Sequence, residues 1–335
     1  MTGISPRPCL PATADAAIQE AVAILKRGGL VAFPTETVYG LGADASNPAA
    51  IARLYKVKGR PADHPVIVHL GDARQMVHWA RDVPESATQL AARFWPGPLT
   101  LVLKRAAGAG DYLTGGQDTV GLRVPGHPIA LELLRQFGGD DDGRRLIGVA
   151  APSANKFGRI SPTTAEHVRN DLGDEVDLIL DGGPCEIGIE STIVDLSRGR
   201  PVVLRPGRIG AEEIEAALRV ETGAPDPGAP RAPGTLESHY APRRPLRLIP
   251  SVQWNEVLRT APLARGVLSL SARPANDASV MWIEAPSDPA RYARGLYVSL
   301  RALDASGGDE ILVEEAPASA EWAAVRDRLA RARTA

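Results

Sequence analysis

Short apolar runs alternate with amphipathic patterns along the first two hundred residues. The runs typical of buried strands lie at residues 30–33, 66–70, 99–103, 120–124, 146–150, 176–180, 192–196 and 202–204. Helical periodicity covers residues 18–25 behind Thr13, a predicted N-cap, and a second helix is predicted behind Asn47. Two more helical patterns lie at 128–137 and 163–172. This alternation predicts an α/β fold with helices layered on a sheet.

Residues 221–245 break this pattern, with six prolines and three glycines in 25 positions. Such a composition is typical of an extended linker. Behind it, strands are predicted at 246–249, 266–270 and 310–313, and helices at 252–260, 289–303 and 318–333. We therefore predict a first domain over residues 1–213, a linker over 214–245 and a smaller α/β domain over 246–335.

Composition agrees with a folded protein and narrows its class. Hydrophobic residues make up 44% and charged residues 23% of the chain, which is too apolar for a disordered protein. No apolar run reaches the ~18 residues of a membrane span, and residues 1–11 hold no secretory pattern, so we expect a cytoplasmic protein without membrane contact. The net charge of −2 leaves RNA contact to a local basic patch. Cys9 and Cys185 are expected to be reduced structural thiols.

Several common catalytic motifs are missing from the sequence. It has no G-x-x-x-x-G-K-[ST] loop and no G-x-S-x-G elbow, and the glycines at 40 and 42 lack the third glycine of a dinucleotide loop. His64 and His69 are five positions apart, which is the wrong spacing for two metal ligands on one helix face. We therefore predict no protein-held metal and neither a serine hydrolase nor a metallohydrolase.

Polar segments rich in proline and glycine are expected directly after strands. They lie at 33–42, 56–61, 95–98, 119–125, 151–162, 188–192 and 204–207. Loops at the carboxyl ends of strands build ligand sites in open α/β sheets. These segments carry the cations Lys58, Arg60, Arg123 and Arg205 together with several hydroxyl groups. Cations and hydroxyls without many carboxylates predict an anionic ligand.

Each of these residues also has an ordinary structural explanation. A single arginine is most often a surface ion-pair partner, and a serine or threonine after a strand most often caps a helix or a turn. His69 alone would be typical of a half-buried histidine, and Trp95 of a packing anchor. The joint occurrence of cations in so many loops favours a binding site, because turns do not require cations.

The same segments carry a resemblance. Residues 28–42, 56–70, 94–103, 119–128, 149–162, 181–196 and 203–208 closely resemble the YrdC-like threonylcarbamoyl-AMP synthase family. Residues 232–242 resemble its two-domain branch, in which a linker joins the catalytic domain to a Rossmann-like domain. The resemblance implies a YrdC-like twisted open sheet with helices on its faces, followed by a smaller Rossmann-like α/β domain.

The resemblance also implies a reaction. L-threonine and bicarbonate or CO2 would form N-carboxy-threonine, which attacks the α-phosphate of ATP with the help of Mg²⁺, so ATP is a substrate and no prosthetic group is needed. The products would be threonylcarbamoyl-AMP and pyrophosphate. Partner proteins would then transfer the threonylcarbamoyl group to tRNA, and weak contact with tRNA itself is left open.

Site residues follow from the matching motifs. The residues implied around threonine are Thr37, His69, Arg123, Ala151 and Ser191. Those implied around ATP are Arg60, His64, Thr119, Ser153, Asn155, Ser161, Arg205 and Tyr240. The residues implied in catalysis are Lys58, Arg60, Arg123 and Ser153. His64 departs from the family pattern, which commonly has asparagine in this turn.

Two other functions are weighed against this one. A double-stranded RNA- or tRNA-binding module without its own chemistry would use a basic concave face, but aromatic residues make up only 4% of the chain, so base stacking would contribute little. A carbamoyl-transfer domain like that of hydrogenase-maturation proteins would require acylphosphatase-like and zinc-finger segments, which the sequence lacks. Pyrophosphate release that depends on threonine and bicarbonate would separate these readings.

Overall fold

The computed structural model describes residues 9–11, 15–139, 146–236, 238–260, 265–275, 277 and 279–333. The chain divides into two compact units. The first unit consists of Met1–Phe157, Pro162–Glu186 and Glu190–Thr235, and the second of Gly158–Ser161, Ile187–Ile189 and Leu236–Ala335. The segment predicted as a linker over 214–245 is therefore shared between the units, and its first residues belong to helix α8 (Ala211–Leu218).

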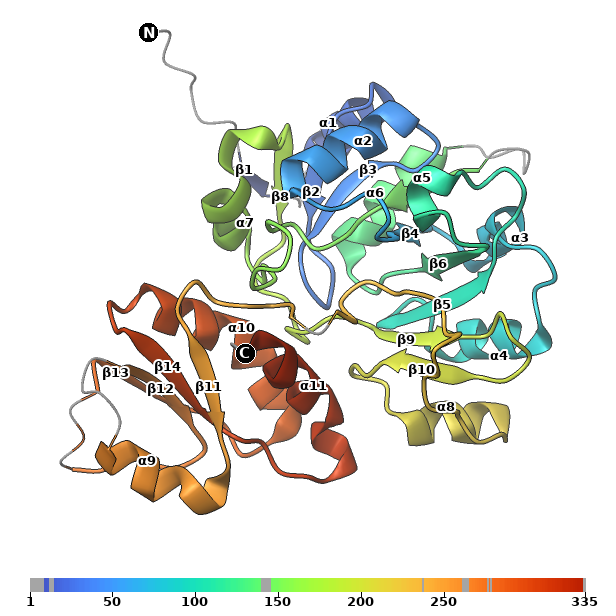
Figure 1. Ribbon diagram of the computed structural model, residues 1–335. Coiled ribbons are helices and arrows are strands. Elements are labelled where there is room, and N and C mark those ends of the chain that lie inside the picture. Colours follow the sequence, from blue (N-terminus) through green and yellow to red (C-terminus); the bar gives the residue numbers. More distant parts are fainter. Residues whose placement is uncertain are drawn as a thin grey trace, which may run out of the picture. The chain divides into compact units, whose positions relative to one another are not determined.

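The first unit is built on one mixed sheet, drawn in Figure 1. Its strand order among the described residues is β1-β8-β2-β3-β7-β4-β6-β5-β9-β10. The strands are β1 (Cys9–Pro11), β2 (Val31–Phe33), β3 (Gly40–Asp44), β4 (Ile67–His69), β5 (Leu99–Lys104), β6 (Thr119–Arg123), β7 (Val149–Ala150), β8 (Leu178–Asp181), β9 (Thr192–Asp195) and β10 (Val202–Arg205). Parallel and antiparallel neighbours both occur, so strand ends point to both edges of the sheet.

Sequence patterns located most of these strands but not β3. Residues 33–42 were predicted as a polar loop, whereas Gly40–Asp44 forms a strand paired with β2 and β7. Two glycines hid the strand, because glycine disfavours strands on average. Gly42 is required here, since a Cβ would lie 2.8 Å from the ring of Phe33 and 2.9 Å from Val149.

Helices cover the two faces of this sheet unequally. They are α1 (Asp15–Lys26), α2 (Pro48–Lys58), α3 (Met76–Trp79), α4 (Glu85–Phe94), α5 (Asp111–Thr114), α6 (Pro128–Gly138), α7 (Ala165–Leu172) and α8, with 3-10 turns at Ala73–Gln75 and Gly173–Glu175. One face buries the main core, in which apolar residues of α2, α4, α7 and α8 pack on strand residues such as Val68, Leu101, Leu122 and Val194.

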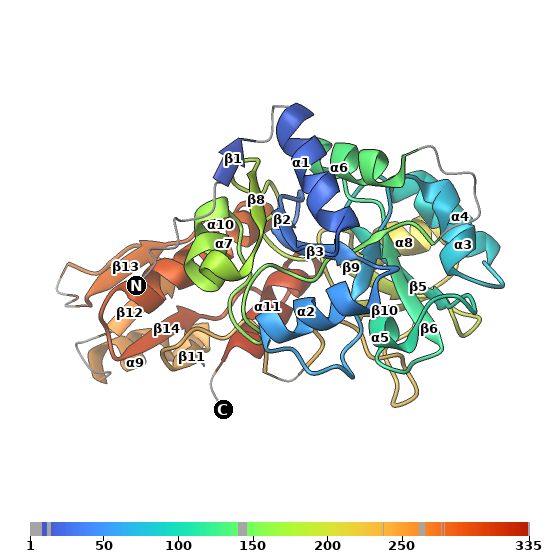
Figure 2. The same cartoon turned by 90° about the horizontal axis from the view of Figure 1, so that it is seen from above.

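The opposite face is covered by α1 and α6, which lie side by side in Figure 2. These two helices pack on residues of β2, β7 and β8, including Phe33, Val149 and Leu178. Over β4, β6, β5 and β9 that face instead holds a small apolar cluster with Ala232. This second half of the face is where polar strand residues gather.

Local capping explains where helix α2 begins and ends. Asn47 caps α2 by accepting hydrogen bonds from the N–H groups of Ala49 and Ala50, as predicted. Gly59 ends α2 with φ of 62°, a left-handed conformation that glycine adopts without strain. Thr13, the predicted cap of α1, lies outside the described residues.

The second unit is a four-stranded parallel sheet in the order β11-β14-β12-β13. Its strands are β11 (Leu246–Ile249), β12 (Arg265–Ser269), β13 (Met281–Glu284) and β14 (Glu310–Glu314), and its helices are α9 (Trp254–Thr260), α10 (Pro289–Ala305) and α11 (Ala323–Ala332), with 3-10 turns at Ser251–Gln253 and Ala320–Trp322. Parallel strands with helices between them confirm the predicted α/β class for this unit. The edge strand β13 was not predicted, because it is short and half-exposed.

The described residues bear on two expectations from the sequence, the reduced cysteines and the lack of a membrane-spanning segment. Cys185 is a buried free thiol. The side chain of Cys9 lies outside what the structure describes. No helix in the described part of the chain combines the length and the apolar character needed to cross a bilayer.

Candidate functional site

Arg123 is a buried and fully oriented cation on the face of the large sheet opposite the main core. It ends β6, is 4% exposed, and donates from Nη2 to Oε1 of Glu36 at 2.7 Å, from Nη1 to Oγ1 of Thr37 at 3.0 Å and from Nε to the carbonyl of Gly97 at 3.2 Å. A guanidinium has five N–H groups, so one on each terminal nitrogen is left after these bonds. These two can receive a carboxylate in bidentate fashion.

The loop after β2 supplies the partners of Arg123. Its shape is set by Thr35, whose hydroxyl accepts from the N–H groups of Thr37 and Val38 and donates to the carbonyl of Val38 at 2.6 Å. This serine/threonine-type turn holds the chain curled. As a result the side chains of Glu36 and Thr37 both meet Arg123, although β2 and β6 are not neighbours in the sheet.

His69 lies beside Arg123 at the end of the neighbouring strand. The two residues are register partners between the parallel strands β4 and β6, so their side chains share one face. His69 is 3% exposed, and burial together with the nearby Arg123 charge lowers its pKa from 6.5 to about 3. It is therefore a neutral imidazole, and its Nδ1 is buried without a hydrogen-bond partner.

Lys58 ties the end of α2 to the loop after β7. Its Nζ donates to the carbonyl oxygens of Ser153 and Asn155, each at 2.5 Å. Burial, together with the charges of Arg60 and Lys156, lowers the Lys58 pKa well below its ordinary value. The amine therefore organises this loop, and it is available to an anion that would restore the charged form.

Arg60 and His64 pack on the ring of Phe157. The guanidinium carbon of Arg60 is 5.5 Å from the ring centroid, and the ring of His64 meets Phe157 edge-on at 5.2 Å. Arg60 also donates from Nη2 to the carbonyl of Pro65 at 2.6 Å. Burial and the Arg60 charge lower the pKa of His64, so its ring is held neutral.

Arg205 organises the entry to β9. It donates from Nη2 and Nε to the carbonyl of Ser191 and from Nη2 to the Ser191 hydroxyl at 3.1 Å. That hydroxyl is also 2.8 Å from Oγ1 of Thr100. From Nη1, Arg205 donates to the carbonyl of Pro233 at 2.8 Å. Part of the segment predicted as a linker is thus bound to the first unit through a buried arginine.

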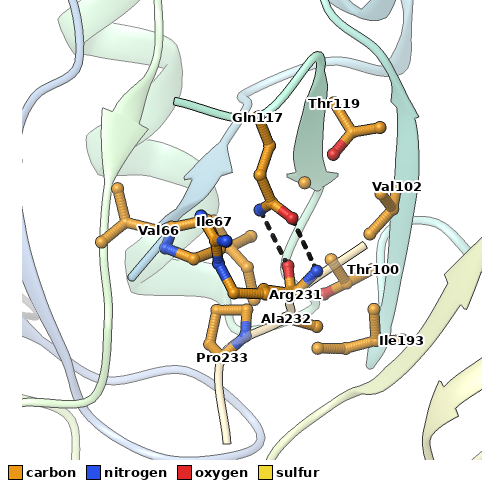
Figure 3. A pocket seen from close by; sticks show the side chains of 12 residues that line it. Val66, Ile67, Thr100, Val102, Gln117, Thr119, Ile193, Arg231, Ala232 and Pro233 are labelled. Carbon is orange, nitrogen blue, oxygen red and sulfur yellow. Dashed lines mark hydrogen bonds between the residues drawn. The ribbon is translucent and has the colours of Figure 1, made fainter. Parts of the chain in front are cut away.

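A small pocket lies on this face beneath residues 231–233, as Figure 3 shows. It is lined by Pro65, Val66, Ile67, Thr100, Val102, Gln117, Thr119, Gly121, Ile193, Arg231, Ala232 and Pro233. The side chain of Gln117 accepts from the N–H of Arg231 at 2.6 Å and donates to its carbonyl at 3.1 Å. This paired contact holds the outer wall over Thr119. The pocket is mostly apolar, with a few polar groups, and its volume of about 10 Å³ gives room for one water molecule.

Strand registers explain why these groups meet. Register pairs place Ile67 opposite Gly121, His69 opposite Arg123, and Arg205 opposite Ile193. Because successive side chains alternate between faces, residues at these levels all project from the same face. His69, Thr119 and Arg123, from β4 and β6, therefore share one face of the first unit. Arg205 follows a register shift in β10 and is placed by its bonds to Ser191 and Pro233.

Part of the reasoning that led to this site was wrong. The segment at 56–61 includes the end of α2, and the segment at 95–98 follows α4. The segment at 119–125 contains strand β6 itself, and the segment at 188–192 leads into β9, so these four do not come directly after strands. The site spreads across a face of the sheet because the sheet is mixed. Ala151, whose N–H donates to the carbonyl of Ile67 at 3.0 Å, and half-buried Ser153 follow β7 as expected.

Ser161 and Tyr240, two residues implied at ATP, belong to the second unit. Tyr240 has a φ of +62° and lies against His239, with ring centroids 4.2 Å apart. The guanidinium carbon of Arg328 is 5.3 Å from the Tyr240 ring. Tyr240 is thus fixed by its own unit in a conformation that non-glycine residues rarely adopt.

Sequence reasoning missed several residues that shape the site. They are Glu36, Thr100, Gln117, Phe157 and Arg231. Glu36 lies inside the polar segment 33–42, and its position between Thr35 and Thr37 was the available signal. The described residues contain no group of three or more His, Cys, Asp or Glu side chains placed to hold a metal ion.

Comparison with known proteins gives two family matches. The Sua5/YciO/YrdC family model, described as "Telomere recombination", matches residues 23–207. The model described as "Threonylcarbamoyl-AMP synthase, C-terminal domain" matches residues 209–334. Together they cover both units.

Individual relatives agree with these matches. A threonylcarbamoyl-AMP synthase of Bacillus subtilis is 40% identical over 333 residues, which cover 96% of this chain and 94% of that protein. A crystal structure of Pyrococcus abyssi Sua5 complexed with L-threonine superposes with a TM-score of 0.82 at 37% identity, covering 94% of this chain and 93% of that one. A putative threonylcarbamoyl-AMP synthase of Mycobacterium tuberculosis is 42% identical over 207 residues, 62% of this chain and 91% of that protein.

Proposed function

The chain belongs to the threonylcarbamoyl-AMP synthase family, and we propose that it makes threonylcarbamoyl-AMP and pyrophosphate from L-threonine, bicarbonate or CO2, and ATP. The family resemblance and the α/β fold predicted from the sequence are thereby confirmed. The relatives named above act as synthases of this nucleotidyl-transferring kind. The residue roles below are proposals that rest on the geometry of this chain.

Threonine would bind around Arg123. Its carboxylate would take the two N–H groups that Arg123 has left, and the neutral Nδ1 of His69 would bond to the substrate hydroxyl. The other residues proposed to contact threonine are Thr37, Ala151 and Ser191. The observation that carries the proposal is that Arg123 is buried and held by three hydrogen bonds, with one N–H on each terminal nitrogen still able to bind a carboxylate.

ATP would bind in the part of the site between the pocket and the buried cations. The base would lie beside Thr119, where the small pocket would have to widen to receive it, and the phosphates would face Lys58, Arg60 and Arg205. The remaining groups of the first unit proposed at the nucleotide are His64, Ser153 and Asn155. Burial makes each cation more effective, since charge interactions strengthen where water is excluded.

The proposed reaction needs positioning more than covalent catalysis. A carbamate loses CO2 readily in water, so it must form and react where it is bound. Its oxygen attacks the α-phosphorus of ATP, the bond to the bridging oxygen breaks, and pyrophosphate leaves. Lys58 and Arg60 would offset the repulsion between the anionic carbamate and the anionic phosphate. The site offers few carboxylates, so Mg²⁺ would arrive with ATP as part of the substrate.

Pyrophosphate release tests this function directly. The wild-type chain should release pyrophosphate from ATP only when both L-threonine and bicarbonate are present. Release that ignores threonine, or no release at all while the protein binds RNA, would overturn the proposal. Downstream, partner proteins would transfer the threonylcarbamoyl group to tRNA, so the proposal puts the reaction in the cytoplasm.

A further inference from the structure

Glu36 has one carboxylate oxygen that the first unit does not use. The residue is 7% exposed, and Oε1 accepts from Nη2 of Arg123 at 2.7 Å. Oε2 is buried and has no hydrogen-bond partner. Leaving a buried carboxylate oxygen without a donor costs free energy, so such an atom marks a place where a ligand is expected to donate.

The ionisable groups around Glu36 do not supply that donor. Arg123 bonds to the other oxygen, and Nδ1 of His127, at the start of α6, accepts from the N–H of Ile129 at 3.2 Å. Burial, with the nearby Glu36 charge, raises the pKa of the Cys185 thiol to about 12, and this thiol makes no hydrogen bond to Oε2. A cationic or N–H-bearing ligand group is the remaining candidate for Oε2.

The Arg123–Glu36 pair presents opposite charges side by side. An amino-acid zwitterion carries a carboxylate and an ammonium on adjacent atoms, so it matches this pair with the charges reversed. If the carboxylate takes the two N–H groups left on Arg123, the ammonium lies next to Glu36. Charge complementarity at such short range selects an α-amino acid over an α-hydroxy acid.

We propose that Oε2 of Glu36 receives the α-ammonium of threonine and accepts its proton before carbamate formation. This proposal rests on the proposed function and adds a catalytic residue to it. Arg123 bonds to Oε1 and fixes the carboxylate, so that Oε2 is the oxygen left to face the ammonium. Glu36 thus turns a protonated, unreactive nitrogen into a nucleophile.

The atoms and charges balance in this step. One ammonium proton moves to Oε2, and the freed nitrogen lone pair forms a C–N bond to CO2 while one C=O electron pair moves onto oxygen. The nitrogen then loses its second proton to water, which gives the N-carboxylate. Glu36 returns its proton to solvent before the next cycle.

Glu36→Gln tests the proposal, because glutamine keeps an oxygen for Arg123 but puts an N–H₂ group where Oε2 was. We expect the KM for threonine to rise by ~100-fold or more, with the KM for ATP unchanged. Residual kcat/KM for threonine should then rise ~tenfold per pH unit towards the pKa of the threonine ammonium, since the free amine becomes the species that binds and reacts. A merely structural role for Glu36 would not create that slope.

Binding measurements provide a second readout. Calorimetry with L-threonine and with 2,3-dihydroxybutyrate, which has a hydroxyl in place of the ammonium, should show a strong preference for threonine in the wild type and none in Glu36→Gln. The matched control is Glu186→Gln, an exposed carboxylate in the same unit, which should leave both ligands unaffected. If Glu36→Gln does not fold, Glu36→Asp replaces it, with partial retention of the threonine preference expected.

The outcomes separate this proposal from the proposed function. If the wild type releases pyrophosphate with threonine, but Glu36→Gln keeps the wild-type threonine KM and pH profile, the role of Glu36 is wrong and the function stands. Equal wild-type affinity for threonine and 2,3-dihydroxybutyrate would also overturn it. If the wild type shows no threonine-dependent turnover, the proposed function itself fails.

Discussion

The two units bury charged side chains in different ways. In the second unit, Arg265 lies 3.6 Å from Asp277, and Arg328 donates to Asp327 at 2.6 Å. The first unit buries Arg123 and Arg205 on one sheet face and Lys58 and Arg60 at the end of α2. Its buried carboxylates among the described residues are Glu36, Glu190 and Asp195, and Asp195 is paired with Arg198. Lys58 and Arg60 bond to backbone carbonyls in the contacts described above.

This difference indicates where an anionic ligand belongs. A buried cation matched by a buried carboxylate is neutral as a pair and needs nothing more. Arg60, which bonds to a carbonyl dipole, keeps its positive charge in a place of low dielectric, which costs stability unless an anion arrives. Lys58, whose pKa is lowered by burial, would regain its charge when an anion binds. The first unit therefore carries the electrostatic signature of a site for carboxylate and phosphate groups.

The largest effects are expected when one buried cation is removed from each unit. Arg123→Ala should lower kcat/KM for threonine by ~1,000-fold, because it removes the carboxylate partner and leaves Glu36 buried without a counter-charge. Arg328→Met should reduce thermal stability but leave the threonine KM of the folded protein unchanged. Steady-state pyrophosphate release and a melting curve are measured on both variants. If Arg123→Ala kept its threonine kinetics while Arg328→Met lost them, the contrast between the two units would be wrong.

The dependence of stability on pH tests whether His69 is buried as a neutral imidazole in the first unit. Its folded pKa of about 3 is below the ordinary 6.5, so the unfolded chain binds more protons between these values and stability falls as pH decreases through that window. The loss between pH 6.5 and 4 should reach about 3 kcal/mol. His69→Asn should flatten this slope, whereas His78→Asn, at a half-buried position on α3, should not. Denaturant unfolding across pH is the measurement, and an unchanged slope in His69→Asn would refute the assignment.

Lys58 offers a test within the first unit. Lys58→Met keeps the length of the side chain but removes the donor to the carbonyls of Ser153 and Asn155, so kcat should fall by ~100-fold. Lys104→Met, at an exposed position at the end of β5, is the control and should be near wild type. Equal kcat values for the two variants would mean that the buried amine of Lys58 contributes no more to catalysis than the exposed amine of Lys104.

Gln117 gives the smallest expected effect. Gln117→Ala removes both hydrogen bonds to the backbone of Arg231 and loosens the wall of the pocket beside Thr119. The KM for ATP should rise by ~5-fold with the threonine KM unchanged, since each lost neutral hydrogen bond has a net value of about 1 kcal/mol. Gln253→Ala, at an exposed position in the second unit, is the matched control. A larger change in the threonine KM than in the ATP KM would argue against a nucleotide pocket here.

The sequence predicted helices and strands with a strong hydrophobic periodicity. It missed a strand that forms because of its neighbours in the sheet. Helix α6 and strand β5 follow their apolar patterns closely. Strand β3 was taken as a loop because its glycines are there for close packing on Phe33, which only the folded sheet reveals. A strand of this kind is specified by its neighbours rather than by its own propensity.

The site was predictable in its chemistry but not in its bonding. The motifs supplied Arg123, Lys58 and Arg205 as a set. That each is already bonded to a neighbouring loop depends on contacts between residues up to 97 positions apart, such as Lys58 with Asn155. Glu36 stayed hidden for the same reason, since only the structure shows that one of its oxygens is bonded and the other is not.

A crystal structure of the wild-type chain with L-threonine and a non-hydrolysable ATP analogue tests the central claim most directly. We predict the threonine carboxylate on the two remaining N–H groups of Arg123, and the triphosphate on the side of Lys58 and Arg60, over the same sheet face. Threonine or the nucleotide bound away from that face, with Arg123 keeping its present contacts and no ligand, would contradict the account.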